Sequence, residues 1–305
     1  MARRRVLVTG ACGYIAGQLL PALRERYDLV LLDTRTEDRS GRPVEGVQVA
    51  DLTNPDLDAC RACFRGIDSV VHLGYIHPST GQGSATIESY RTERTNVDMA
   101  FHVFQLSMEE GVRRVVVASS NHAADWYEHL LHAKKKDVVA PEERPLSDNF
   151  YGWAKATYEH LGFVFASGRL GRSLENIQVR IGAPREPEAA RYHGNPTGFH
   201  RDLGAYISQR DLQQLFVRSI EAEDIRDRSG IPFQVFYGIS DNARQFWSIA
   251  NAREVIGYAP QDDSEIKFAA GIAAILAPLG GPVPARPYPP RKNDLNDPSR
   301  PGCGP

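Results

Sequence analysis

The sequence predicts an α/β protein built on a doubly wound parallel sheet, with a small C-terminal lobe. Short apolar segments alternate with helical segments from the N-terminus onward. The apolar segments are rich in Val, Ile and Leu and almost continuously hydrophobic, as strands buried on both faces of a parallel sheet are. The alternation fades after Gly182, where a polar stretch containing Gly and Pro begins. A chain of 305 residues is long enough to bury a core of this size.

The predicted strands and helices follow one another in the order that repeated strand, helix, strand units require. Residues 96–111 and 151–168 carry apolar side chains at three- and four-residue spacing, which is typical of helices that cover a sheet. Ser208 and Asp211 have the spacing of a helix N-terminal cap. The predicted strands are residues 5–10, 28–33, 47–52, 69–74, 113–120, 176–182 and 233–241, and the predicted helices are residues 15–27, 96–111, 151–168, 207–223 and 247–258.

The part of the chain after residue 182 is predicted to divide between the sheet and the lobe. We expect residues 209–240 to return to the sheet domain formed by residues 1–182. Residues 183–208 and 241–280 should form the small substrate-binding lobe, because the first of these stretches is too long for a simple connection. Proline is so frequent in residues 281–305 that we expect a flexible, extended tail there.

Composition and charge favour a small-molecule ligand over a macromolecule. The chain has 36 Lys and Arg against 38 Asp and Glu, a net charge of −2, so we expect no binding to nucleic acid or to an anionic membrane. No stretch approaches the length of a membrane span, about 20 apolar residues. The N-terminal arginines precede an apolar run too short for a signal peptide, so the sequence predicts a cytoplasmic location.

The four cysteines predict neither a disulfide framework nor a metal site. Cys12, Cys60, Cys63 and Cys303 are too few and too scattered for a disulfide framework in a chain of this length. Cys60 and Cys63 form a lone C-x-x-C pair without a second pair of ligands, so we expect a helix face instead of a metal or redox centre.

The first predicted strand runs into the stretch TGACGYIAG, which has the features of a dinucleotide-binding turn. Gly10 permits a tight turn, Gly13 permits close approach to a pyrophosphate, and Ala16 is small enough for helix–strand packing. Asp33 follows Gly10 by 23 residues, at the end of the second strand, where a carboxylate binds the ribose hydroxyls. The sequence therefore predicts that residues 1–182 are a Rossmann-type domain. Asp33 favours NAD over NADP, although Arg35 could counter its repulsion of a 2′-phosphate.

The end of the third predicted strand also carries candidate cofactor contacts. Asp51 and Leu52 are placed to meet the adenine, although an Asp in an ordinary strand-terminating turn explains the pattern equally well.

Tyr151 and Lys155 are candidate catalytic residues. They are four positions apart in YGWAK, at the start of a predicted helix, and therefore share one face. An ammonium group near a phenol stabilises the phenolate, so we expect Lys155 to lower the pKa of Tyr151 toward a value useful for acid–base catalysis. NAD binding upstream and serines at the end of the fifth strand support a catalytic role.

These motifs occur in the order found in one enzyme family. With TGACGYIA, HLG at 72–74, SS at 119–120 and YGWAK, the chain resembles the extended short-chain dehydrogenases/reductases of the NAD-dependent epimerase/dehydratase superfamily. The resemblance implies a catalytic triad of Ser120, Tyr151 and Lys155, with Ser119 as a structural neighbour. It implies cofactor contacts by Gly10, Cys12, Gly13, Tyr14, Ile15, Asp33, Asp51, Leu52, Leu73, Gly74, Asn96 and Lys155.

The polar stretch after the fifth strand narrows the resemblance. ASSNH, YGWAK, VRIG and RDLGAYISQRD together are similar to the NAD-dependent uronate dehydrogenases in order and spacing. That resemblance implies that Asn121 and His122 contact sugar hydroxyls and that Arg201 holds the substrate carboxylate. His77 and Ala183 stand where that group has serines, with His77 a further candidate for substrate binding, and residues 121–150 are longer than in that group.

The resulting functional hypothesis is NAD-dependent oxidation of a sugar or sugar acid, a uronate or another aldose, at C1 to the lactone. One alternative is a sugar epimerase or dehydratase that keeps NAD bound and returns the hydride. The other is a non-catalytic nucleotide sensor, which would have no reason to keep Ser, Tyr and Lys together. The family resemblance also implies a homodimer, and Leu161, Phe163 and Phe165 are available for that contact or for the core.

Overall fold

The computed structural model describes residues 3–79, 81 and 85–281, and it confirms the predicted doubly wound sheet. The sheet has seven strands in the order β3-β2-β1-β4-β5-β6-β7, and every pair of neighbours is parallel. This order reverses at β1 and β4, the point at which such sheets bind ligands. The strands are β1 Arg5–Thr9, β2 Asp28–Asp33, β3 Val47–Val49, β4 Ser69–His72, β5 Arg114–Ser120, β6 Glu175–Ile181 and β7 Phe233–Gly238.

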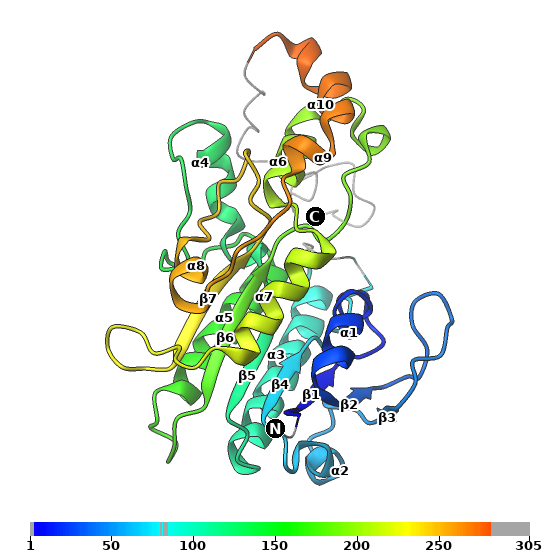
Figure 1. Cartoon of the computed structure of the whole chain (residues 1–305), viewed down its shortest axis with the longest axis vertical. Coiled ribbons are helices and arrows are strands. Elements are labelled where there is room, and N and C mark those ends of the chain that lie inside the picture. Colours follow the sequence, from blue (N-terminus) through cyan, green and yellow to red (C-terminus); the bar gives the residue numbers. More distant parts are fainter. Residues whose placement is uncertain (1–2, 80, 82–84, 282–305) are drawn as a thin grey trace, which may run out of the picture.

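Helices cover both faces of this sheet, as Figure 1 shows. On one face, α1 (Tyr14–Arg26) packs against α7 (Gln209–Glu221). On the other face, α3 (Ile87–Glu109) packs against α5 (Phe150–Ala166). The short helix α2 (Asp58–Arg61) lies at the bottom of the view in Figure 1. The helix α7 begins as predicted, because the Ser208 hydroxyl accepts a hydrogen bond of 3.2 Å from the Asp211 amide.

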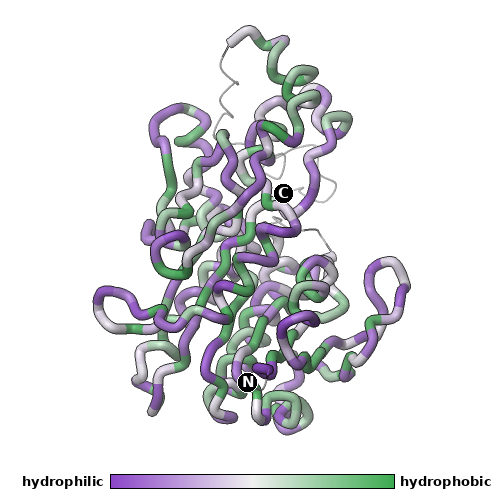
Figure 2. The backbone as a smooth tube through the Cα atoms, in the orientation of Figure 1, coloured by the Kyte–Doolittle hydropathy of each residue, from purple (hydrophilic) through white to green (hydrophobic). Residues whose placement is uncertain are grey.

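Successive strand residues supply two separate cores. In β1, Val6 and Val8 join the core beneath α1 and α7, whereas Leu7 joins the core beneath α3 and α5. Apolar residues therefore dominate the strands through the centre of the molecule (Figure 2). This two-sided burial is the physical reason for the continuous hydrophobicity of the predicted strands.

The helix α3 is longer than the sequence predicts. It starts at Ile87 instead of 96, because Thr86 and Ser89 form a capping box and Glu93 is buried within its second turn. The stretch between β5 and α5 contains a 3₁₀ helix, Asn121–Tyr127, followed by α4 (Glu128–His132). Cys60 and Cys63 are buried in the core under α3, as a helix face would be.

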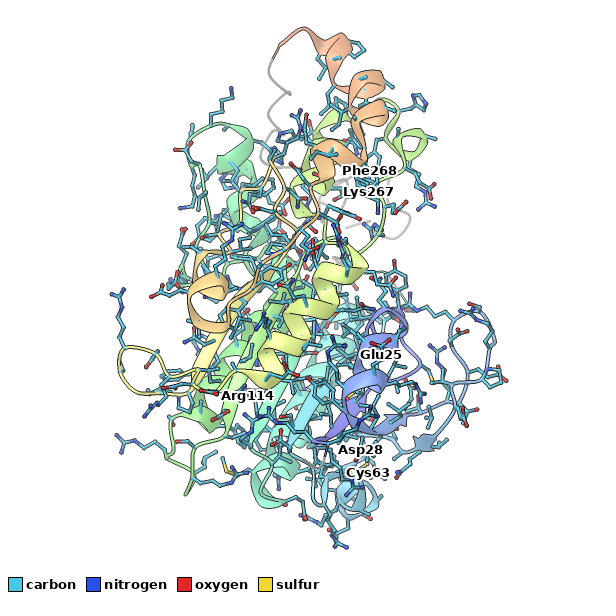
Figure 3. The ribbon with its side chains drawn as sticks, in the orientation of Figure 1. Glu25, Asp28, Cys63, Arg114, Lys267 and Phe268 are labelled. Carbon is cyan, nitrogen blue, oxygen red and sulfur yellow. The ribbon has the colours of Figure 1, made fainter. Side chains whose placement is uncertain are left out.

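Helices α6 (Pro196–Ala205), α9 (Ser264–Lys267) and α10 (Ala269–Ile275) gather beyond the carboxyl end of the sheet (Figure 1). Their small core includes Phe199, Leu203 and Leu276. Figure 3 shows Lys267 and Phe268 in this lobe and Arg114 near the opposite end of β5. Helix α8 (Ala250–Ile256) differs from the predicted division, because Ala252 and Ile256 join the main core.

None of the helices within the described ranges is long and apolar enough to cross a membrane. The predicted flexible tail, residues 281–305, lies outside the described residues except for Gly281.

Candidate active site

A cavity of about 740 Å³ lies at the carboxyl end of the sheet and extends from the turn after β1 to the small lobe. Its walls include strand ends, the start of α5 and the start of the stretch after β6. This is the place where open parallel sheets bind nucleotides. The predicted site residues that line it are Gly10, Gly13, Tyr14, Ile15, Asp33, Asp51, Leu52, Leu73, Gly74, His77, Ser120, His122, Tyr151, Lys155 and Arg201.

The turn after β1 fits the pyrophosphate of a dinucleotide. Gly10 has φ of +69°, and a Cβ atom there would lie 2.7 Å from the backbone nitrogen of Gly74. Helix α1 begins directly after Gly13, no described side chain caps it, and its first turn has no acidic residue. Its amide groups are therefore available to a phosphate, which the helix dipole attracts.

Asp33 is held in position for a ribose. Its Oδ2 accepts a hydrogen bond of 2.9 Å from the Cys12 amide, and its Oδ1 accepts one of 2.7 Å from the Thr34 amide. Arg35 donates to the Cys12 carbonyl oxygen at 3.1 Å. Cys12 is buried and, within the described part of the chain, outside the cavity lining, so it supports Asp33 from behind.

The two serines at the end of β5 have different surroundings. The Ser119 hydroxyl donates to Glu159 at 3.1 Å, and Glu159 forms a buried bidentate ion pair with Arg180. The Ser120 hydroxyl instead lies beside Tyr151, whose pKa it lowers, and accepts from the His122 amide at 3.2 Å. Ser119 thus anchors the strand in the core, and Ser120 lies beside the tyrosine.

Tyr151 lies in the first turn of α5, whose N-terminal cap is Asn149. Burial raises the pKa of Tyr151 to about 12, although the hydrogen bond with Ser120 acts in the opposite direction. The sequence led us to expect a lowered pKa. The direction differs because removal of the phenol from water disfavours its anion more strongly than the groups around it favour that anion.

Lys155 lies one turn further along α5 and is buried. Its Nζ donates to the Ala118 carbonyl oxygen at 2.9 Å and lies 4.5 Å and 5.7 Å from the ring centroids of Tyr158 and Tyr151. Burial lowers the pKa of Lys155 to about 8, and the carboxylate of Glu93 raises it.

Glu93 is a site residue that the sequence analysis missed. It is completely buried, and it accepts hydrogen bonds from the Tyr75 hydroxyl at 2.5 Å and from Asn96 at 3.2 Å. Asn96 also exchanges two hydrogen bonds with the backbone of Ile76. Within the described residues Asn96 is therefore not part of the cavity lining, and it holds the segment after β4 in place.

A second missed group connects the two ends of the stretch between β5 and α5. His122 Nδ1 lies 2.9 Å from Asp125 Oδ2, and Asn149 donates to the same oxygen at 3.1 Å. The Asn149 side chain in turn accepts from the Gly152 amide at 3.0 Å. This group fixes His122 against the start of α5, so that the His122 and Tyr151 rings lie 5.6 Å apart. The spacing of His122 and Asp125 was the available sequence signal.

Arg201 reaches the cavity from α6, but its guanidinium is already bound by carboxylates. Nε and Nη2 donate to Glu128 Oε1 at 3.1 Å and 2.9 Å, and Nη1 donates to Asp202 Oδ1 at 3.0 Å. The guanidinium also lies 5.4 Å from the ring centroid of Trp247. Glu128 belongs to the long stretch after β5, and nothing in its sequence context predicted this contact.

The remaining predicted contacts are distributed as follows. His77 lines the cavity, and its Nε2 lies 2.9 Å from the Arg39 guanidinium. Burial, and to a smaller extent the charge of Arg39, lowers the pKa of His77. Asn121 is buried next to Ser120 and, among the described residues, is not part of the lining.

The fold and the site together define an NAD-dependent oxidoreductase of the short-chain dehydrogenase/reductase type. A dinucleotide turn and the group of Ser120, Tyr151 and Lys155 line one cavity. The model of the NAD dependent epimerase/dehydratase family matches residues 6–192, and the chain belongs to this family.

Three similar proteins span nearly the whole chain. It is 32% identical to the NAD-dependent glucose-6-phosphate dehydrogenase of Haloferax volcanii, over 85% of this chain and 94% of that protein. It is 31% identical to a uronate dehydrogenase of Pseudomonas putida, over 90% of each chain. A variant of the uronate dehydrogenase from Agrobacterium tumefaciens, solved with NAD, is 25% identical, with a TM-score of 0.69 over 96% of this chain and 93% of that one.

Proposed function

We propose that the chain oxidises the C1 hydroxyl of a ring-form sugar or sugar acid to the lactone, with NAD. The observation that carries this proposal is the position of Ser120 beside Tyr151, in the cavity that the dinucleotide turn also lines. The similar dehydrogenases named above act on sugars by their names, which supports this class of substrate.

The residues of the chain would divide the reaction between them. Ser120 binds the C1 oxygen and orients it toward Tyr151, which removes the hydroxyl proton as a phenolate. NAD, when bound, accepts the hydride from C1. Because burial opposes the phenolate, the nearby Lys155 ammonium is needed to stabilise that anion and to hold the nicotinamide ribose. We assign substrate contacts to His77, His122 and Arg201, which line the cavity, whereas the buried Asn121 would support Ser120 from behind in place of the sugar contact expected of it.

Replacement of one hydroxyl tests the mechanism. The Tyr151→Phe variant should bind NAD as the wild type does, but its kcat should be lower by at least about a thousandfold, because the general base is missing. Tyr158→Phe is the matched control: it lies on the same helix, is buried, and its hydroxyl has no hydrogen-bond partner in the described structure. NADH formation with a panel of sugars gives kcat, and calorimetry gives NAD affinity. Activity near wild type in Tyr151→Phe would contradict the proposal.

An epimerase or dehydratase that returns the hydride is the alternative that the family description names. Protein purified with NAD already bound, which forms no NADH with any sugar of the panel, would favour that alternative. Stoichiometric release of NADH favours the dehydrogenase.

A cytoplasmic location stays a prediction. We also propose that two copies of the chain form a homodimer through α3 and α5. Phe165 lies in the core, whereas Phe163 is 42% exposed. Other exposed apolar residues on these two adjacent helices are Ile87, Tyr90, Phe101, Trp153 and Val164. Analytical ultracentrifugation tests the dimer, and Phe101→Glu should convert it to monomers.

A further inference from the structure

The charge around Arg201 defines what kind of sugar group can lie beside it. Arg201 and its two carboxylate partners are shielded from water, because the side chains of Arg201, Glu128 and Asp202 are only 14%, 10% and 12% exposed. One guanidinium therefore faces two carboxylates in a poorly solvated place. The local charge is negative before any substrate binds.

Other charged groups nearby do not reverse this balance. Asp125 adds another buried carboxylate on the His122 side of the cavity. Arg185 also lines the cavity and lies 3.8 Å from Asp202, but its side chain is 63% exposed, so solvent screens its charge.

The hydrogen bonds of Arg201 lead to the same result as its charge. A guanidinium has five N–H groups. Three of those in Arg201 donate to Glu128 and Asp202, and its Nε, Nη1 and Nη2 atoms are each engaged. A substrate carboxylate on the two N–H groups that remain, one on Nη1 and one on Nη2, would be the third carboxylate around one poorly solvated guanidinium, which is unfavourable. Single N–H groups on Nη1 and Nη2 suffice for a hydroxyl oxygen.

We infer that the sugar group facing Arg201 is an uncharged hydroxyl, and that the enzyme oxidises neutral aldoses in preference to uronates and sugar phosphates. This inference rests on the proposed function. It replaces the carboxylate-binding role expected of Arg201, and it makes Glu128 a specificity-determining residue, supplied by the long stretch after β5.

Matched sugars test this preference in the wild-type enzyme. Glucose and glucuronate, and galactose and galacturonate, differ only at C6, and glucose 6-phosphate adds a phosphate there. We expect kcat/KM with NAD to be at least about tenfold higher for the neutral member of each pair. A preference for the uronate or the phosphate would overturn the inference while supporting the proposed function. If no sugar yields NADH, the proposed function fails and the inference fails with it.

Glu128→Gln tests the residue assigned to specificity. The substitution removes one of the two carboxylate charges beside Arg201. The kcat/KM for a uronate, divided by the kcat/KM for the matching neutral sugar, should therefore rise about tenfold, with the KM for NAD unchanged. Glu143→Gln is the control, because Glu143 lies in the same stretch but pairs with Lys136, and neither is among the described residues that line the cavity. An unchanged ratio in folded, NAD-binding Glu128→Gln would refute the role of Glu128.

Discussion

Gly152 should be essential to the geometry of the site although it has no side chain. A Cβ atom at this position would lie 2.1 Å from Ser147 Oγ and 2.2 Å from the His122 carbonyl oxygen, where ordinary contacts are 3.4–4 Å. The Ser147 hydroxyl can rotate away, but Ser147 Cβ, 2.4 Å from the added atom, and the His122 carbonyl oxygen are fixed to the backbone. Gly152→Ala must therefore move His122 and the start of α5 apart by about 1 Å.

This displacement lies between the two halves of the site, because Tyr151 precedes Gly152 and Ser120 accepts from the His122 amide. A misplacement of about 1 Å costs on the order of a hundredfold in rate. Overpacking should also lower the free energy of unfolding by about 1–3 kcal/mol. We expect kcat/KM to fall about a hundredfold in a protein that still folds and binds NAD.

NADH formation and urea unfolding measure both effects. Gly17→Ala is the control, because a Cβ atom at Gly17 on α1 would have no heavy atom of the described structure within 4 Å. Alanine should stabilise that helix slightly, by up to about 1 kcal/mol. If Gly152→Ala retains kcat/KM within about twofold of wild type, the contact with His122 does not set the catalytic geometry.

Three more predictions concern buried groups that can carry a charge. Glu159→Gln leaves the Arg180 guanidinium without its buried partner, so urea unfolding should show a loss of about 3–5 kcal/mol. Burial lowers the pKa of His72 to about 3. From about pH 6.5 down to pH 3 the unfolded chain therefore binds a proton that the folded chain does not, and stability falls with pH by up to about 1.4 kcal/mol per unit. His72→Asn should flatten that slope, and an unchanged slope would exclude His72 as its source. Because Glu93 raises the pKa of Lys155, Glu93→Gln should move the alkaline limb of the kcat profile to lower pH, whereas an unshifted limb would contradict the coupling.

The sheet and its cofactor motif could be predicted because their signals are local. Strands buried on both faces must be apolar along their length, and Gly10 and Asp33 follow strand ends at fixed spacing. The first turns of α3 carried no such signal. Residues 87–95 are mostly polar, and their helix depends on the Thr86 cap and on a buried glutamate.

The polar surroundings of the site depended on contacts between distant residues. Glu128 and Arg201 are 73 positions apart, so the neutralisation of the arginine appears only when α4 and α6 are placed together. The same is true of Glu93, whose effect on Lys155 requires α3 to pack against α5. The raised pKa of Tyr151 likewise follows from burial, which motif spacing does not report.

The stretch between Ser120 and Tyr151 separates two tasks, the chemical step and the choice of substrate. Its ends belong to the frame of β5 and α5, which carries the chemistry, while its middle supplies Glu128 to Arg201, a residue of the cavity wall. Substitutions in that middle part can thus alter which molecule is accepted without rebuilding the machinery that oxidises it. For a protein engineer, substrate choice is therefore a property that can be exchanged while the reaction centre stays unchanged.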